Sequence, residues 1–199
     1  MPVSCKIISV GLEGVAPLMF DRYAGDNETQ LPVEQKMHFG ADGRTLVLPQ
    51  TNIYSFLTAE NTVSAPRAIF DARKYKDVCR AIKGFVLVLP ISGDIPILRK
   101  GKPIVFNGFS DGRDEKAGIY VRKDTARLKD GVPNPKVRPV IELPWGVEFA
   151  LQLLDNDGEM TPEKLEHVFS LGGLKVGFGT FRGVYGKFAV TKWEVTTGK

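Results

Sequence analysis

The chain of 199 residues is long enough for one domain, or for one domain with a large insertion. Hydrophobic residues make up 43% of it, the formal net charge is +4, and there are only two cysteines and two histidines. These counts exclude a zinc motif and argue against a structural disulfide. No apolar run is long enough to span a membrane and the first residues lack a signal-peptide core, so we predict a cytoplasmic protein without membrane contact.

The charge is distributed unevenly along the chain. Residues 99–138 hold 11 Lys and Arg against 5 Asp and Glu, and residues 172–199 hold 5 against 1. Residues 139–171 reverse this balance, with 1 against 7. Clustered basic charge is the electrostatic signature of a nucleic-acid binder, whereas a single lysine is ordinarily a solvated surface residue.

The first half of the chain alternates between strand and helix patterns. In chain order we expect a strand over 6–15, a polar loop over 21–44, a short strand over 45–49, a helix from Thr51 or Asn52, a helix over 72–83 ended by Gly84, and a buried strand over 85–90. The core pattern then stops. Residues 91–144 predict a basic β insertion, with Arg99-Lys100-Gly101-Lys102 at the tip of a hairpin.

The core pattern resumes in the last third of the chain. Residues 145–154 alternate as a strand, and Thr161-Pro162 predicts the start of a helix that Gly172 ends. A final strand is expected over 186–195. The order strand, helices, strand, insertion, strand, helix, strand is that of a βαββαβ antiparallel sheet, a ferredoxin-like (RRM-like) α+β fold with helices on one face. We expect residues 1–90 and 145–199 to form the two parts of this core, with 91–144 projecting from it like a thumb.

A Gly-rich loop near the C-terminus has six glycines in fifteen residues. Glycine lets backbone N–H groups approach an anion closely, and the loop adds the cations Lys175, Arg182 and Lys187. It also carries rings on which bases can stack: Phe178, Phe181, Tyr185 and Phe188. The loop matches neither a Walker A nor a Rossmann pattern. The alternative is an ordinary hairpin with its rings in the core.

Three segments carry a resemblance to a known family. Leu46–Leu57, with its apolar-Pro-Gln-Thr-Asn sequence, is similar to a strand-to-helix element of the RAMP superfamily of CRISPR-associated proteins. Gly172–Phe188 resembles the Gly-rich element of that superfamily, and Gly14–Met19 resembles its Ser-Pro-Leu segment. With Arg138-Pro139, the layout also resembles a group of phage and prophage proteins.

The resemblance implies an RNA-binding subunit of an antiviral ribonucleoprotein. Backbone subunits of this kind polymerise along a guide RNA, hold it through its phosphates, and carry a thumb like residues 91–144. We therefore expect a non-catalytic binder of RNA or single-stranded nucleic acid that forms a homo-oligomer or filament, alone or with other subunits of a ribonucleoprotein complex. The contacts implied are Lys175, Phe178, Phe181, Arg182, Tyr185 and Lys187 from the loop, and Arg99, Lys100, Lys102, Arg122, Lys123, Arg127 and Arg138 from the insertion.

Two alternatives remain open. The first is a metal-independent endoribonuclease in which His38 is the general base, assisted by Tyr23 and Lys36. Asp21 is a second weak catalytic candidate, although a single carboxylate is poor support for a metal site, and we expect neither a metal nor a cofactor. The second alternative is a phage structural or inhibitory protein that uses the apolar residues of the insertion for protein contacts: Ile95, Ile97, Ile104, Val105, Phe106 and Phe109.

Overall fold

Alternating apolar residues form the two central strands of a large antiparallel sheet. β1 (Cys5–Gly14) and β10 (Gly146–Leu154) pair along almost their whole length. Ile8, Val10 and Leu12 point to one face, where all three are buried, as the period of two requires. The computed structural model describes residues 4–26, 28–59, 63–91, 93–127 and 133–198.

The strand order places the two ends of the chain side by side. β11 (Phe188–Gly198) pairs antiparallel with the other edge of β1. β4 (Val86–Leu89) and β5 (Asp94–Arg99) pair antiparallel with successive parts of β10, and β3 (Val47–Pro49) and β6 (Lys102–Pro103) pair with β5. Residues 94–103, which lie within the predicted insertion, therefore belong to the main sheet.

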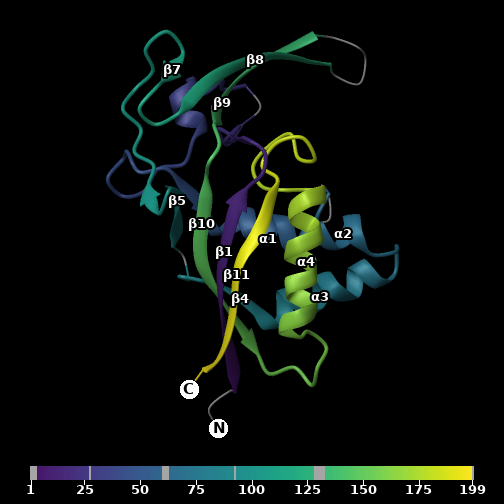
Figure 1. The fold of residues 1–199 in the computed structure, drawn as a ribbon. Coiled ribbons are helices and arrows are strands. Elements are labelled where there is room, and N and C mark those ends of the chain that lie inside the picture. Colours follow the sequence, from purple (N-terminus) through teal and green to yellow (C-terminus); the bar gives the residue numbers. More distant parts are fainter. Residues whose placement is uncertain (1–3, 27, 60–62, 92, 128–132, 199) are drawn as a thin grey trace.

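Helices cover one face of this sheet (Figure 1). They are α1 (Gln50–Thr58), α2 (Ala65–Ile69), α3 (Lys74–Phe85) and α4 (Pro162–Lys175), while a short 3-10 helix, η1 (Val33–Lys36), lies in the predicted polar loop. The ring of Phe56 lies at the centre of the core, 5.5 Å from that of Phe169 and 5.1 Å from that of Phe178. None of the described helices combines the length and apolar character needed to cross a bilayer.

A second antiparallel sheet lies above the main one. Its order is β2 (Leu18–Met19), β9 (Pro133–Ile141), β8 (Ile119–Arg127) and β7 (Arg113–Asp114). The long β8–β9 hairpin arches over the end of the main sheet (Figure 1). The fold is thus a mixed α+β arrangement of antiparallel sheets, as the sequence predicted.

Arg99, at the end of β5, joins the two sheets. Its guanidinium donates hydrogen bonds to the carbonyls of Pro144 (3.0 Å), Glu142 (2.8 Å) and Ala117. The planar fork of arginine suits this convergence of acceptors, and burial lowers the pKa of the guanidinium despite the nearby Glu142 carboxylate. The structure therefore gives this predicted phosphate contact an internal role.

Helix α4 runs past the glycine that was expected to end it. Thr161 caps its start as predicted, because the side-chain oxygen accepts a hydrogen bond from the Lys164 N–H (3.3 Å). The helix nevertheless continues through Gly172 and Gly173 to Lys175, so the prediction of its end was wrong. Both glycines are buried where α2 and β11 approach, and the absence of a side chain permits that approach.

Candidate nucleic-acid interface

The Gly-rich loop, residues 176–187, closes on itself between α4 and β11. The N–H of Phe178 donates to the Gly186 carbonyl (2.9 Å), and the N–H of Gly183 donates to the Val176 carbonyl (2.8 Å). Gly186 has a φ of 69°, and a Cβ there would overlap the carbonyl oxygen of Phe178. Glycine is required at this position because the backbone segments touch. The loop is therefore ordered by its own hydrogen bonds.

The loop is also fastened to the second sheet. The N–H of Thr180 donates to the Met19 carbonyl (2.9 Å), and the N–H of Gly186 donates to the Pro17 carbonyl (2.7 Å). Figure 1 shows the loop at the end of α4, beneath the β8–β9 hairpin. These contacts fix the loop at the junction of the two sheets.

The four rings of the loop region divide into core and surface. Phe178 and Phe188 are fully buried, with ring centroids 4.5 Å apart, so neither is accessible to a base. Tyr185 is 8% exposed. Phe181 is 53% exposed and adopts a φ of 54°, a left-handed conformation that is unusual for a residue with a bulky side chain. Of the predicted stacking residues, the structure leaves Phe181 on the surface.

Phe181 begins a stack that reaches the β8–β9 hairpin. Its ring lies 5.8 Å from that of Tyr185, with the planes 29° apart. The guanidinium of Arg122 lies 5.6 Å from the centroid of Tyr185, and it also forms an ion pair with Asp124 (2.7 Å). Two predicted site residues from distant parts of the chain, Phe181 and Arg122, thus belong to one stack.

Arg182 is a half-buried cation that lines an open pocket of about 550 Å³. Its Nη2 donates to the Ser55 hydroxyl (2.8 Å), and its other nitrogens donate to the carbonyls of Val63 (3.3 Å) and Gly179 (3.3 Å). Among the described residues no carboxylate pairs with it, and burial lowers the pKa of the guanidinium. Its charge is held in place by neutral groups and is not neutralised.

The other two cations of the loop differ in exposure. Lys175 is exposed, lines the same pocket, and donates to the Ala68 carbonyl (3.4 Å). Lys187 is half-buried, and its carbonyl accepts hydrogen bonds from the N–H groups of Val15 (2.8 Å) and Ala16 (3.2 Å). Lys175 and Arg182 therefore face one pocket, with Thr180 and Ser55 as further polar groups in its wall.

The predicted contacts of the insertion are scattered. Lys100, on the turn after β5, and Lys102, at the start of β6, are both exposed, and two strands separate β5 from β11 in the sheet. Lys123 is exposed on β8, and the side chain of Arg127 lies outside the described residues. Lys123 follows Arg122 on this strand, so its side chain points to the opposite face of the β8–β9 hairpin.

Asp21 and Arg138 form an ion pair instead of two separate sites. The Asp21 carboxylate accepts from Arg138 (2.8 Å) and from Lys36 (3.2 Å), with all three side chains mostly buried. Burial by itself raises the pKa of Asp21, but the hydrogen bonds from Arg138 and Lys36 outweigh it and lower that pKa. This pairing occupies the Asp21 carboxylate and the Arg138 cation within the fold.

His38 is half-buried and lies edge-on to Phe20, with ring centroids 5.8 Å apart. Burial and the charge of Arg22 lower the pKa of His38, although Asp94 opposes them. This environment favours the neutral imidazole. Lys36, which was expected to assist it, pairs instead with Asp21.

Sequence reasoning did not identify Ser55 as part of the site. It lies on α1 and accepts the hydrogen bond that orients Arg182, across 127 positions of the chain. Its neighbour in sequence, Tyr54, also contacts the core, donating through its hydroxyl to the Val86 carbonyl (3.5 Å). No local pattern distinguishes the two, so only the packing of α1 against the loop reveals the role of Ser55.

One chain of a solved RNA-bound assembly has a similar fold. No known family profile matches the chain, and no curated protein matches it. A chain in the cryo-EM structure of the type III-B Cmr-β complex bound to cognate target RNA is similar, with a TM-score of 0.58 and 12% sequence identity. The similarity covers 96% of this chain and 61% of that one, so this chain spans about three fifths of its neighbour's length. At this identity the comparison establishes a shared fold.

Proposed function

We propose that this chain binds single-stranded nucleic acid, RNA in the first instance, across the Gly-rich loop and the adjoining face of β8. The observation that carries the proposal is Arg182, a half-buried guanidinium without a carboxylate partner among the described residues, which faces an open pocket. A charge held in surroundings of low dielectric attracts a phosphate more strongly than a fully solvated one. The exposed ring of Phe181 beside it offers a stacking surface for a base.

The topology of the core, the thumb and the kind of subunit are parts of the same proposal. The antiparallel order β11–β1–β10–β4, with helices between β1 and β4 and between β10 and β11, supports a ferredoxin-like core with the β8–β9 hairpin as its thumb. The similar fold in the RNA-bound Cmr-β structure supports an RNA-binding subunit of the CRISPR RAMP type. That this subunit has no catalytic role and assembles along the strand is part of the proposal. We propose 1–90 and 145–199 as the two parts of the core and 91–144 as the insertion, of which 94–103 joins the main sheet.

Salt-dependent binding tests the electrostatic part of the proposal. Fluorescence anisotropy with a labelled single-stranded RNA of about 20 nucleotides, and with DNA of the same sequence, gives affinity over a series of salt concentrations. Each phosphate contact contributes a slope of about 0.7 in log affinity against log salt for single strands. Lys175→Gln should lower the slope by about that amount. Lys76→Gln, an exposed lysine on α3, is the matched control and should leave it unchanged.

Phe181→Ala tests stacking separately. Loss of one stacked base costs about 1–3 kcal/mol, so affinity should fall while the salt slope stays the same. Arg182→Lys, which keeps the charge but not the fork, should weaken binding less than Arg182→Met. Circular dichroism of both variants checks that the protein remains folded. Salt-independent binding, or no binding at all by the folded wild-type chain, would refute the proposal.

A further inference from the structure

β11 is an edge strand of the main sheet. One of its sides pairs with β1 and the sheet order ends there, so no described strand pairs with its other side. The residues from Thr191 to Thr197 are exposed, except for Trp193, which is half-buried. Figure 1 shows β11 running along the margin of the sheet, with α4 on the helical face. The free side of β11 is therefore accessible to another strand.

The hydrogen bonds at the two ends of β1 show in which direction each of its residues bonds. The N–H of Asp155, just after β10, donates to the Ser4 carbonyl (3.0 Å), so the even-numbered residues of β1 bond toward β10. The N–H of Val15 donates to the Lys187 carbonyl (2.8 Å), just before β11, so the odd-numbered residues bond toward β11.

The register of the two strands transfers this alternation to β11. The odd-numbered Ile7 lies opposite Thr196, whose hydroxyl also donates to the Ile7 carbonyl (3.3 Å). Opposite residues of such a pair exchange their hydrogen bonds, so the even-numbered residues of this part of β11 bond to β1. The residues between them direct their N–H and carbonyl groups to the free side: Trp193, Val195 and Thr197. In the described part of the chain no partner bonds to these groups.

The free backbone groups are arranged symmetrically about Val195. A second copy of β11, placed antiparallel with its Val195 opposite the first, brings Trp193 opposite Thr197 and engages all three residues in about six hydrogen bonds. Moving the centre to Glu194 would set two carboxylates opposite each other, which is unfavourable. Moving it to Trp193 would bring in Thr191, which the register against β1 leaves out as a bulge. The strand thus favours the register centred on Val195.

The side chains suit the same register. Val195 is an apolar residue that is 45% exposed, and it would pack against its own copy. Lys192 and Glu194 form an ion pair along the strand (3.2 Å), so neither brings an unpaired charge to the contact. Glu194 would lie opposite Thr196 of the second copy, and no like charges would meet. Self-pairing of β11 therefore adds hydrogen bonds without an electrostatic penalty.

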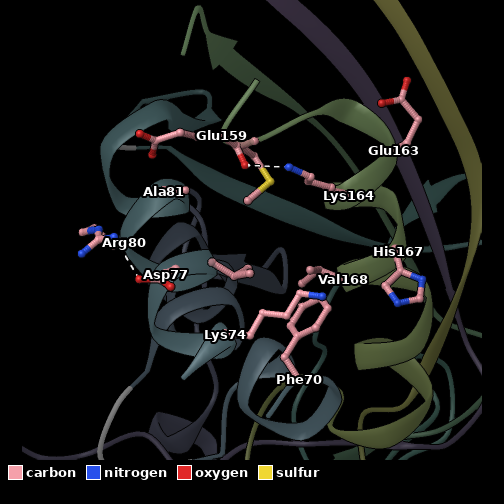
Figure 2. Close-up of a pocket in the computed structure, with 12 residues that line it drawn as sticks. Phe70, Lys74, Asp77, Arg80, Ala81, Glu159, Glu163, Lys164, His167 and Val168 are labelled. Carbon is pink, nitrogen blue, oxygen red and sulfur yellow. Dashed lines mark hydrogen bonds and ion pairs between the residues drawn. The ribbon is translucent and has the colours of Figure 1, made fainter. Parts of the chain in front are cut away.

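A groove of about 680 Å³ between α3 and α4 is a less suitable surface for a second copy (Figure 2). Lys74 lies 5.5 Å from the centroid of the Phe70 ring on one side of it. Lys164, on the other side, donates to the carbonyls of Gly158 (3.1 Å) and Glu159 (3.1 Å), which leave its charge in place. A second copy that filled the groove would have to bury both ammonium groups, a cost that the edge of β11 does not impose.

We propose that this protein forms a two-fold dimer in which β11 of one copy pairs antiparallel with β11 of the other, centred on Val195. The two main sheets then continue into one, with the helices of both copies on the same face. Such a contact is isologous and closes on itself, so it is independent of nucleic acid and distinct from assembly along a strand. Because the contact is short, we expect a weak dimer with a Kd on the order of 100 µM.

Sedimentation velocity of RNA-free protein over about 5–500 µM brackets this Kd and measures the dimer. Val195→Lys places like charges opposite each other at the two-fold axis and should weaken the dimer at least about tenfold. Val105→Lys makes the same change at a valine that is 39% exposed and lies outside β11, so it is the matched control and should leave the Kd unchanged. The melting temperatures of both variants show that they are folded.

Mixing two charge variants tests the register. Val195→Lys and Val195→Glu should each dimerise weakly alone, whereas an equimolar mixture should dimerise at least as well as the wild type, because opposite charges then face each other. Hydrogen exchange of the Trp193 and Thr197 amides should also slow as the wild-type concentration rises. A protein that stays monomeric to about 1 mM, ten times the expected Kd, would overturn the proposal. So would a dimer that Val195→Lys leaves intact, or a mixture no more dimeric than its components.

Discussion

The same substitution, glycine to alanine, should have opposite effects in two helices of this protein. Alanine is favoured over glycine within a helix by about 1 kcal/mol, so the substitution ordinarily stabilises. Gly84, near the end of α3, is exposed, and an added Cβ would meet nothing within 4 Å. Gly84→Ala should therefore raise the free energy of unfolding by about 0.5–1 kcal/mol.

Gly172, inside α4, has no such space. An added Cβ would overlap the Cβ of Ala65 on α2 and lie 2.9 Å from Cζ of Phe56. Ala65 is part of a helix backbone that cannot turn aside, so overpacking should cost close to the upper end of its usual 1–3 kcal/mol. Subtracting the gain in helix propensity leaves a loss of about 2 kcal/mol, or a fall of about 4–8 °C in Tm for a domain of this size.

Thermal and urea unfolding followed by circular dichroism measure both variants. The expected result is a lower Tm for Gly172→Ala and a slightly higher one for Gly84→Ala. A Gly172→Ala protein at least as stable as the wild type would show that α2 is not held against α4 as the structure describes. It would also mean that close packing does not explain why glycine stands at this position within α4.

Two further predictions concern the polar contacts that hold the second sheet. Arg99→Met removes the donors to the carbonyls of Pro144, Glu142 and Ala117, and each carbonyl left unpaired should cost about 1–3 kcal/mol. The variant should be cut within residues 115–144 by limited proteolysis, whereas the control Lys100→Met should not. Asp21→Asn removes two charged hydrogen bonds and should cost about 1.5–3 kcal/mol at pH 7. The pKa of Asp21 is lowered in the folded state, so its contribution to the free energy of unfolding is complete above the unfolded pKa of 3.8. That contribution is lost as pH falls through the folded pKa. The stabilities of the wild type and of Asp21→Asn should therefore become equal in acid. Equal denaturation midpoints for the two proteins at pH 7, or a difference that persists well below pH 3.8, would contradict this assignment.

The sequence predicted the elements whose signals are local. Strand β10 follows from strict alternation, and the start of α4 follows from Thr161 as cap with Pro162 in the first turn. Helix α2 was missed because its five residues are too few to show a helical period. The end of α4 was wrong because glycine signals both a helix end and a close helix contact. Only the position of Ala65 distinguishes these two uses at Gly172.

The sequence alone also does not show which aromatic rings of the Gly-rich loop are buried. Phe178 and Phe181 are separated by two residues and have the same side chain, yet one is fully buried and the other is 53% exposed. Phe178 packs against Phe56 and Phe188, which come from other elements. Exposure therefore depends on contacts that lie far away in the sequence, and composition alone assigned both rings to the same role.

The basic residues show which part of a charge pattern predicts binding. Arg99 and Arg138 are bound by carbonyls or a carboxylate of the chain itself, whereas Lys123 and Lys175 remain exposed. The difference has a physical cause, because the planar fork of arginine satisfies several fixed acceptors at once, while the ammonium group of lysine is more strongly hydrated. Arg182 departs from this division, since its partners are neutral and it lines an open pocket. A count of basic residues therefore overstates the charge available to a polyanion, and the cations that remain available lie at the Gly-rich loop, on β8 and at the turn between β5 and β6.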